Sequence, residues 1–141
     1  MAKHYSSAQE AEDAFYDAID DRDLDSMMGV WEDSDEIACL LPMQPLAQGR
    51  NQLMQTWKAL LEGDFSLEIQ VHHIRWLESG DFALHYCQEV AKVGGQTQPQ
   101  PPVYATNLYR KGPDGWHLIL HQNSPAPPPP GMVPPGMQMP Q

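Results

Sequence analysis

Apolar residues recur at three- and four-residue steps in the first part of the chain, a period typical of amphipathic helices. The first such stretch covers residues 6–19, with its acidic residues expected on the far side. Asp23 is a suitable N-cap for a short second helix, and Gly49 begins a third that ends before Gly63. We therefore expect three helices before residue 64.

Strands are predicted by a different pattern. A short apolar run at 36–41, ended by Pro42, predicts a buried strand between the second and third helices. After Gly63 the apolar residues alternate with a period of two, which predicts strands at 66–77, 82–93, 103–111 and 115–123. Helices followed by an antiparallel meander predict an α+β fold, with the helices covering one face of the sheet.

Proline marks the end of the globular part. Eight of the 14 prolines lie in residues 125–141, and proline fixes φ and lacks a backbone donor, so this tail cannot form helix or sheet. We expect a single domain over residues 1–124. The tail is either a solvated appendage or a strap that packs on the domain or on a second subunit through Met132, Val133, Met137 and Met139.

Charge is distributed unevenly along the chain. The formal net charge is -11, and twelve of the 19 acidic residues lie in residues 1–36, where only Lys3 and Arg22 are basic. An acidic chain without a basic patch repels phosphate backbones, so we expect no nucleic-acid partner. The rest of the chain is close to neutral, so the acidity belongs to the outward faces of the first two helices.

The expected compartment and the expected lack of cofactors are inferred from sequence patterns that the chain does not contain. No apolar run is long enough to span a membrane, and the first residues lack the apolar core of a signal peptide. Cys39 and Cys87 show no metal-ligand spacing and fit two free buried thiols in a reducing compartment. We expect a cytoplasmic protein with no membrane association, no metal site and no flavin, nicotinamide or haem cofactor.

Three stretches carry a resemblance to a known family. Asp-Leu-Asp at 23–25 follows the first helix, and residues 42–50 lead into a helix that carries Trp57. The last hairpin contains Thr-Asn-Leu-Tyr-Arg-Lys, Asp-Gly-Trp and Ser-Pro-Ala-Pro within residues 106–127. Over residues 6–127 the chain resembles the NTF2-like superfamily, particularly its SnoaL-like branch. It is similar to the association domain of calcium/calmodulin-dependent protein kinase II and, more distantly, to ketosteroid isomerase.

The resemblance implies a cone-shaped α+β barrel, with three N-terminal helices packed on a curved, mainly antiparallel sheet that wraps a pocket. In such families the other side of the sheet often supports dimerisation, so a homodimer through the sheet is expected. The fold hosts isomerases, dehydratases, cyclases and pure assembly domains, so it does not by itself identify a reaction.

Strand alternation indicates which residues would line this pocket. The pocket arginines of the related association domain align with Glu89, Asn107 and Asn123 of this chain. Without those arginines the pocket favours neutral or cationic ligands over carboxylates. The candidate ligand-binding residues on this face, or facing it from the helices, are Tyr16, Trp57, His85, Glu89, Asn107, Tyr109, His121 and Asn123.

These candidates also have purely structural interpretations. His121 fits a structural histidine near a strand end, Glu89 a solvent-facing acid, and Trp57 a core residue. His72 and His73 are adjacent, so their side chains point to opposite faces of a strand and cannot bind one metal together.

Steroid isomerisation of the ketosteroid isomerase type is not expected. The resemblance places the base of that enzyme immediately before the proline that ends the first strand, and Leu41 occupies this position. Leucine cannot transfer a proton. The first-helix tyrosine of that family aligns with Phe15, one residue from Tyr16.

Two functions of different classes remain open. The first is a pocket that binds a small, mostly apolar organic molecule, with or without proton-transfer catalysis. As an enzyme the protein would be an isomerase, dehydratase or cyclase, with His121 or His85 as general base, Glu89 orienting it, and Tyr109 and Asn107 as donors. The alternative is an oligomerisation or association module with a vestigial pocket.

Overall fold

The computed structural model describes residues 3–64 and 66–125. Its elements are α1 (Ala8–Asp21), α2 (Leu24–Val30), β1 (Ala38–Leu40), β2 (Ala47–Gln48), α3 (Gly49–Leu61), β3 (Leu67–Ser79), β4 (Phe82–Val93), β5 (Val103–Gly112) and β6 (Gly115–Pro125). This order agrees with the predicted helices and meander, and β6 extends one residue into the predicted tail. The remainder of that tail, with Met132, Val133, Met137 and Met139, lies outside the described residues.

Side-chain caps fix where the first two helices begin. The Ser7 hydroxyl accepts a hydrogen bond from the Glu10 backbone N–H at 3.1 Å, and the Glu10 carboxylate accepts one from the Ser6 backbone N–H at 2.8 Å. Asp23 accepts from the Ser26 N–H at 3.1 Å and is the N-cap of α2, as predicted. These contacts satisfy donors that the first turn of a helix leaves unpaired.

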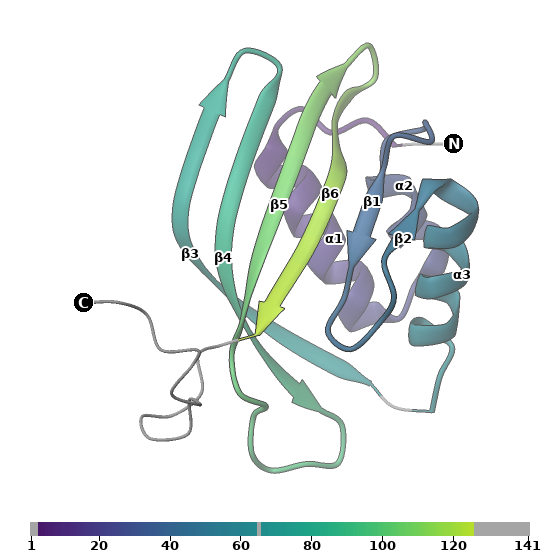
Figure 1. The fold of residues 1–141 in the computed structure, drawn as a ribbon, viewed down its shortest axis with the longest axis vertical. Helices are drawn as coiled ribbons and strands as arrows, with labels where there is room; N and C mark the ends of the chain where they lie inside the picture. Colours follow the sequence, from purple (N-terminus) through teal and green to yellow (C-terminus); the bar gives the residue numbers. More distant parts are fainter. Residues whose placement is uncertain (1–2, 65, 126–141) are drawn as a thin grey trace, which may run out of the picture.

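One mixed sheet holds all six strands, in the order β2-β1-β6-β5-β4-β3. Strands β3 to β6 form an antiparallel meander, whereas β1 pairs in parallel with β6. The last strand among the described residues, β6, therefore lies in the interior of the sheet, beside β1 (Figure 1). The sheet is curved and not closed, and the helices pack on it as the resemblance implied.

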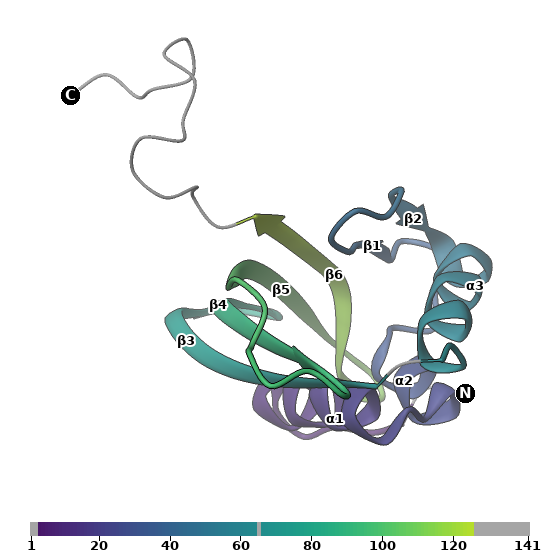
Figure 2. The same cartoon turned by 90° about the horizontal axis from the view of Figure 1, so that it is seen from below.

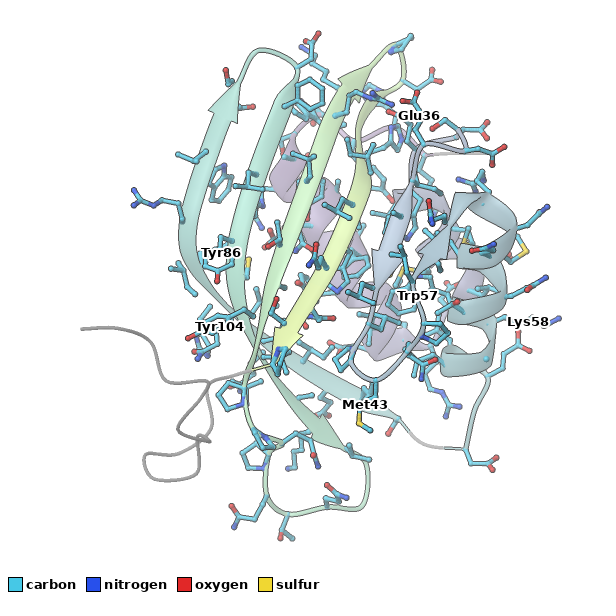
Figure 3. All side chains as sticks on the ribbon, viewed as in Figure 1. Glu36, Met43, Trp57, Lys58, Tyr86 and Tyr104 are labelled. Carbon is cyan, nitrogen blue, oxygen red and sulfur yellow. The ribbon has the colours of Figure 1, made fainter. Side chains whose placement is uncertain are left out.

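The two faces of the sheet have different neighbours. The helices lie on one side, which we call the inner face, and Figure 2 shows α1 crossing beneath the strands with α3 beside β1 and β2. Alternate residues of β4 point to the inner face, so His85 and Cys87 are fully buried there. On the outer face Tyr86 and Tyr104 stack with ring centroids 5.8 Å apart (Figure 3).

Two β-bulges change which residues face inward. The pairing of β3 with β4 shifts after His73 and leaves Ile74 as an extra residue. Because a bulge reverses the alternation of the strand, both His73 and Trp76 reach the inner face, where the Trp76 ring lies 4.1 Å from the His85 ring. A second shift, at Ile119 of β6, brings Leu118 into the core.

One prediction about charge is wrong at a single position. The acidic residues of the first helix were expected on its outward face, but Glu12 is only 2% exposed and points to the sheet. It is held there by His73 and His85, which supply the hydrogen bonds that a buried carboxylate needs.

Across the described ranges 3–64 and 66–125, none of the helices combines the length and the apolar character that crossing a membrane would require.

Candidate functional site

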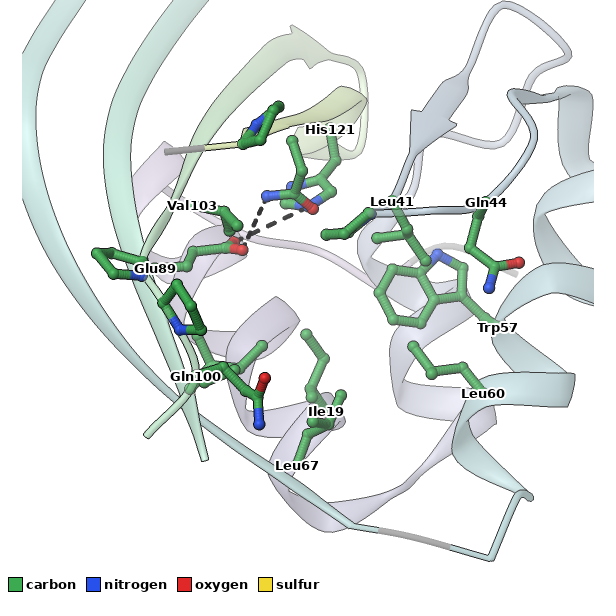
Figure 4. A pocket seen from close by; sticks show the side chains of 17 residues that line it. Ile19, Leu41, Gln44, Trp57, Leu60, Leu67, Glu89, Gln100, Val103 and His121 are labelled. Carbon is green, nitrogen blue, oxygen red and sulfur yellow. Dashed lines mark hydrogen bonds and ion pairs between the residues drawn. The ribbon is translucent and has the colours of Figure 1, made fainter. Parts of the chain in front are cut away.

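A cavity of about 580 Å³ lies between α1, α3 and the inner face of the sheet (Figure 4). Its apolar wall is formed mainly by Ile19, Leu41, Trp57, Leu60, Leu67 and Ile69. Glu89 of β4 with His121 and Asn123 of β6 interrupt this wall with polar groups, and the loop residues Gln44 and Gln100 add two more polar side chains to the lining. The volume and the mixture of apolar wall and few polar groups are typical of small-molecule sites.

Glu89, His121 and Asn123 belong to a closed ring of hydrogen bonds, here called the Glu89 network. Its members are Tyr16, Glu89, Asn107, His121 and Asn123. The Tyr16 hydroxyl bonds to Glu89 Oε2 at 2.6 Å, and Asn123 Nδ2 donates to Glu89 Oε1 at 2.9 Å. Two contacts of His121 close the ring, 2.5 Å from Nδ1 to Asn107 Oδ1 and 3.0 Å from Nε2 to Asn123 Oδ1. Asn107 Nδ2 lies 3.0 Å from the Tyr16 hydroxyl.

Carbonyl contacts determine which ring nitrogen of His121 must carry a proton. Asn123 Nδ2 also lies 3.1 Å from the backbone carbonyl of Tyr104, which can only accept. The amide oxygen of Asn123 therefore faces His121 Nε2, and because this oxygen also only accepts, Nε2 must be protonated.

An imidazole and a carboxylate lie side by side in this network. His121 Nε2 and Glu89 Oε2 are 3.9 Å apart, and the other ring nitrogen of His121 lies 2.5 Å from Asn107 Oδ1. The edge of the cavity therefore presents both a basic ring and a carboxyl group.

Burial sets the protonation of the network. It lowers the pKa of His121, and the nearby Glu89 carboxylate and the hydrogen bond to Asn123 oppose this effect. Burial, together with Glu89, raises the pKa of Tyr16 well above its ordinary value. Tyr16 therefore stays a hydrogen-bond donor, whereas His121 releases its proton more easily than an exposed histidine.

Half of the predicted ligand-binding residues lie on the cavity wall. They share the inner face of the sheet or face it from α3, as strand alternation predicted for the three sheet residues. These residues are Trp57, Glu89, His121 and Asn123.

The other predicted residues do not line the cavity. Tyr16 and Asn107 bond to the polar residues of the wall from behind. The pairing of His85 with Glu89 that the sequence left open is absent among the described contacts, since His85 Nδ1 bonds to Glu12 instead. The hydroxyl of Tyr109 is buried, and no described residue bonds to it.

Sequence reasoning missed a second cluster, here called the Glu12 cluster, made of Glu12, His73, His85 and Cys87. Glu12 Oε1 lies 2.5 Å from His73 Nε2, and Oε2 bonds to His85 Nδ1. Burial opposes ionisation of Glu12, but its bonds to the two histidines outweigh this and lower its pKa. The helical period could have identified Glu12 as a buried residue, because position 12 lies between 8 and 15 on the apolar face of α1.

Leu41, at the position of the steroid isomerase base, is part of the apolar wall of the cavity. The first-helix residue that reaches the sheet network is Tyr16, whereas Phe15 packs against Trp57 with ring centroids 5.5 Å apart. Arginine and lysine are absent from the described residues that line the cavity.

The curved sheet, its three helices and a cavity on the helical side define a protein of the NTF2-like class. The chain belongs to the SnoaL-like domain family, which matches residues 9–128. The resemblance inferred from residues 6–127 is thereby confirmed.

Solved structures give the same placement. A protein from Thiobacillus denitrificans described as a calcium/calmodulin-dependent protein kinase type II association domain is 33% identical, with a TM-score of 0.83 over 88% of this chain and 98% of that one. A Streptomyces avermitilis protein described as a dehydratase of the NTF2-like family is 26% identical, with a TM-score of 0.75 over 84% of this chain and 92% of that one.

A curated relative is found in a plant. F-box protein SKIP8 of Arabidopsis thaliana is 27% identical over 110 residues, which are 78% of this chain. The matched region is 46% of that protein, so the chain spans about half the length of this relative.

Proposed function

We propose that the protein binds a small, mostly apolar organic molecule in the cavity between α1, α3 and the sheet. The observation that carries this proposal is a cavity of about 580 Å³ whose apolar wall is interrupted at one edge by Glu89, His121 and Asn123. An apolar body fits the wall, and one polar group of the ligand meets that edge.

The polar edge favours a particular kind of ligand group. Glu89 and Asn123 are 5% and 8% exposed, so they are the members of the Glu89 network that a ligand meets first. No described wall residue is a lysine or arginine, so a carboxylate ligand would be buried without a partner charge. The site therefore suits a neutral or cationic molecule with a hydrogen-bond donor.

Three probes with one apolar body test this proposal by titration calorimetry: naphthalene, 2-naphthol and 2-naphthoate. We expect 2-naphthol to bind at least tenfold more tightly than 2-naphthoate, because its hydroxyl can donate to the polar edge. Glu89→Gln removes the carboxylate from this edge, so it should reduce the difference in affinity between 2-naphthol and 2-naphthoate. Equal binding of all three probes, or no binding of any, would contradict the proposal.

A matched pair of variants on α3 locates the binding. Leu60 lines the cavity, whereas Met54 on the same helix is 45% exposed. Leu60→Trp should fill the cavity and abolish binding of 2-naphthol, and Met54→Trp should leave it unchanged. If both variants bind alike, the ligand lies elsewhere.

A histidine beside a carboxylate favours a second candidate function, proton transfer to a bound molecule. Both His121 and Glu89 line the cavity, 3.9 Å apart, so a ligand atom at this edge meets two groups of the kind that act in acid–base catalysis. The dehydratase description of the Streptomyces neighbour belongs to a reaction class that uses such proton transfers.

Exchange of a carbon-bound hydrogen tests this second function. The neutral bicyclic ketone 2-tetralone has acidic hydrogens beside its carbonyl, and in D₂O a base that removes one returns deuterium from the solvent. We expect the protein to accelerate this exchange, and His121→Asn and Leu60→Trp to abolish the acceleration. If 2-tetralone binds but its hydrogens exchange no faster than in buffer alone, the proposed proton transfer is contradicted and the function is binding only.

A further inference from the structure

The Glu12 cluster lies one helical turn along α1 from the Glu89 network and outside the cavity wall. Glu12 and Tyr16 are four residues apart, so α1 presents each of them to a different position along β4. Around Glu12 these neighbours are His73, His85 and Cys87. Neither Glu89 nor His121 contributes to this second group.

Side chains from three elements converge in the cluster. His73 and Cys87 are directly paired across β3 and β4, and Glu12 reaches them from α1. A ring nitrogen of His73, Cys87 Sγ and a Glu12 carboxylate oxygen all lie within 4.8 Å of one another. The bulge at Ile74 adds Trp76 to the same face, where its ring lies 5.3 Å from His73.

We propose that Glu12, His73 and Cys87 form a binding site for a divalent transition-metal ion of the zinc type. One carboxylate oxygen, one imidazole nitrogen and one thiolate provide three ligands, which leaves the fourth position of a tetrahedral ion open. Ligand atoms lie about 2.0–2.3 Å from a bound zinc ion, so two ligands of one tetrahedral ion are more than about 2.5 Å from each other. Binding of the ion would therefore replace the direct 2.5 Å contact between Glu12 and His73.

The surroundings of the three ligands fit this role. His85 bonds to the second oxygen of Glu12 and thereby holds the carboxylate, as neighbours of metal-bound carboxylates do. His85 is 0% exposed, and its Nε2 bonds to none of the described residues. The cluster therefore contains a buried polar atom whose hydrogen bond is not made within the described part of the protein.

Charge and access support the same assignment. Both ion-pair partners that the described structure gives Glu12 are histidines, so no fixed positive charge competes with a cation there. The His73 side chain is 36% exposed, whereas that of Glu12 is 3% exposed, so an ion can enter past the β3 edge and become enclosed.

The donor set selects the class of metal. Thiolate and imidazole ligands suit zinc, cobalt and related ions, whereas magnesium and calcium need several oxygen ligands. Only one of the three donor groups here is a carboxylate, so magnesium and calcium are expected to bind weakly.

Cobalt(II) provides a direct probe, because a cobalt–thiolate bond absorbs in the near ultraviolet and a tetrahedral cobalt site absorbs in the visible. Protein treated with a chelator and a reductant is titrated with CoCl₂ and then with ZnCl₂. We expect one Co²⁺ per chain with both absorptions, displacement by Zn²⁺, and no effect of Mg²⁺.

Matched variants identify the ligands. Cys87→Ser should abolish the thiolate absorption, and Cys39→Ser, at the other buried cysteine, should retain it. His73→Gln should weaken binding at least 100-fold, whereas His72→Gln on the opposite face of β3 should not. We expect His85→Gln to weaken binding about 10–100-fold. Circular dichroism of each variant checks that it is folded.

The result that overturns the proposal is equally direct. Absence of saturable Co²⁺ binding in the folded wild type, or a thiolate absorption that survives Cys87→Ser, removes the site. So does a spectrum unchanged by both His73→Gln and Glu12→Gln. Naphthol binding in the cavity is measured separately, so the failure of either proposal leaves the other standing.

Discussion

His121 has both ring nitrogens bonded inside the protein, so its protonation is part of the stability of the fold. Asn107 and Asn123 hold the ring, Phe15 packs against it with centroids 4.9 Å apart, and Glu89 and Tyr16 are the titratable groups that face it. Burial lowers the pKa of this imidazole from its ordinary value of 6.5. The unfolded chain therefore binds a proton at a higher pH than the folded protein.

This difference predicts a pH dependence of stability. Above pH 6.5 the ring is neutral in both states, and as pH falls below 6.5 the free energy of unfolding decreases until pH passes the lowered pKa of the folded state. One proton corresponds to a slope of at most about 1.4 kcal/mol per pH unit. Urea unfolding between pH 7 and pH 5 should show a shallower slope in His121→Asn than in the wild type.

His72, which is exposed on β3, provides the control for this measurement. His72→Asn should keep the wild-type slope. Identical slopes for all three proteins would show that His121 takes up its proton equally in the folded and unfolded states.

Tyr16 is the donor that ties α1 to the sheet. Removing its hydroxyl leaves Glu89 Oε2 without its 2.6 Å bond and Asn107 Nδ2 without an acceptor. Because unpaired buried polar groups are costly, Tyr16→Phe should lower the free energy of unfolding by about 1–3 kcal/mol. Urea denaturation measures this, and Tyr86→Phe on the outer face should change it by less than about 0.5 kcal/mol.

Residue types along the chain predict the polar face of the sheet but not the partners within it. Strand alternation brings His85 and Glu89 to the same face, and their spacing allows a pair. The observed partner of His85 is Glu12, which lies at an inward position of the helical pattern but was assigned to the solvent side because it is charged. Helical periodicity indicates the face on which Glu12 lies, but it contains no information on the distant histidines that bind it.

At the scale of elements, the turn between β5 and β6 has a strict requirement at Gly115. Its φ is 97°, and a Cβ there would lie 2.3 Å from the backbone oxygen of Tyr5, which accepts a hydrogen bond from the Trp116 N–H. Gly115→Ala should therefore lower the free energy of unfolding by more than about 2 kcal/mol.

Gly112 in the same turn is the matched control. A Cβ at Gly112 meets nothing within 4 Å, and its φ is not positive, so Gly112→Ala should be close to neutral. The melting temperatures of the two variants, measured by thermal unfolding, compare their stabilities. A loss of similar size at the two positions would mean that the contact with Tyr5 is unimportant.

The ends of helices and strands were predictable where a cap or turn residue close in sequence determines them. The Asp23 cap, Gly49 at the start of α3 and the turns of the meander were visible in the chain, and the strand ends differ by two residues or fewer. The bulges at Ile74 and Ile119 were not, because the extra residue in each is an isoleucine, an ordinary strand residue, and only the pairing with the partner strand reveals it.

At the scale of the whole molecule, we propose that the outer face of the sheet forms a homodimer. Tyr86 and Tyr104 stack there and remain half-buried, and Ile74 of β3 and Phe82 of β4 are 51% and 45% exposed. Light scattering coupled to size exclusion should give a dimer, and Tyr86→Lys with Tyr104→Lys should give a monomer. Met54→Lys on α3 should remain a dimer.

The same measurement addresses the assembly function. A ring of many subunits would favour an association module like the one named for the Thiobacillus protein, and a wild-type monomer would contradict both assemblies. Truncation after Pro125 tests the predicted strap, since a tail that packs on the domain or a second subunit would raise the melting temperature or the dimer affinity of the full chain.

The position of β6 has a consequence for the order in which the chain folds during synthesis. Backbone pairing joins Tyr5 to Gly115, Trp31 to Leu118, and β1 to residues 120–122, so three connections from the N-terminal part run to the last strand. Tyr5, Trp31 and β1 therefore leave the ribosome before the strand they pair with exists. Until about residue 125 has emerged, these segments lack their β6 partner, and only then can the nascent chain complete the sheet and close its cavity.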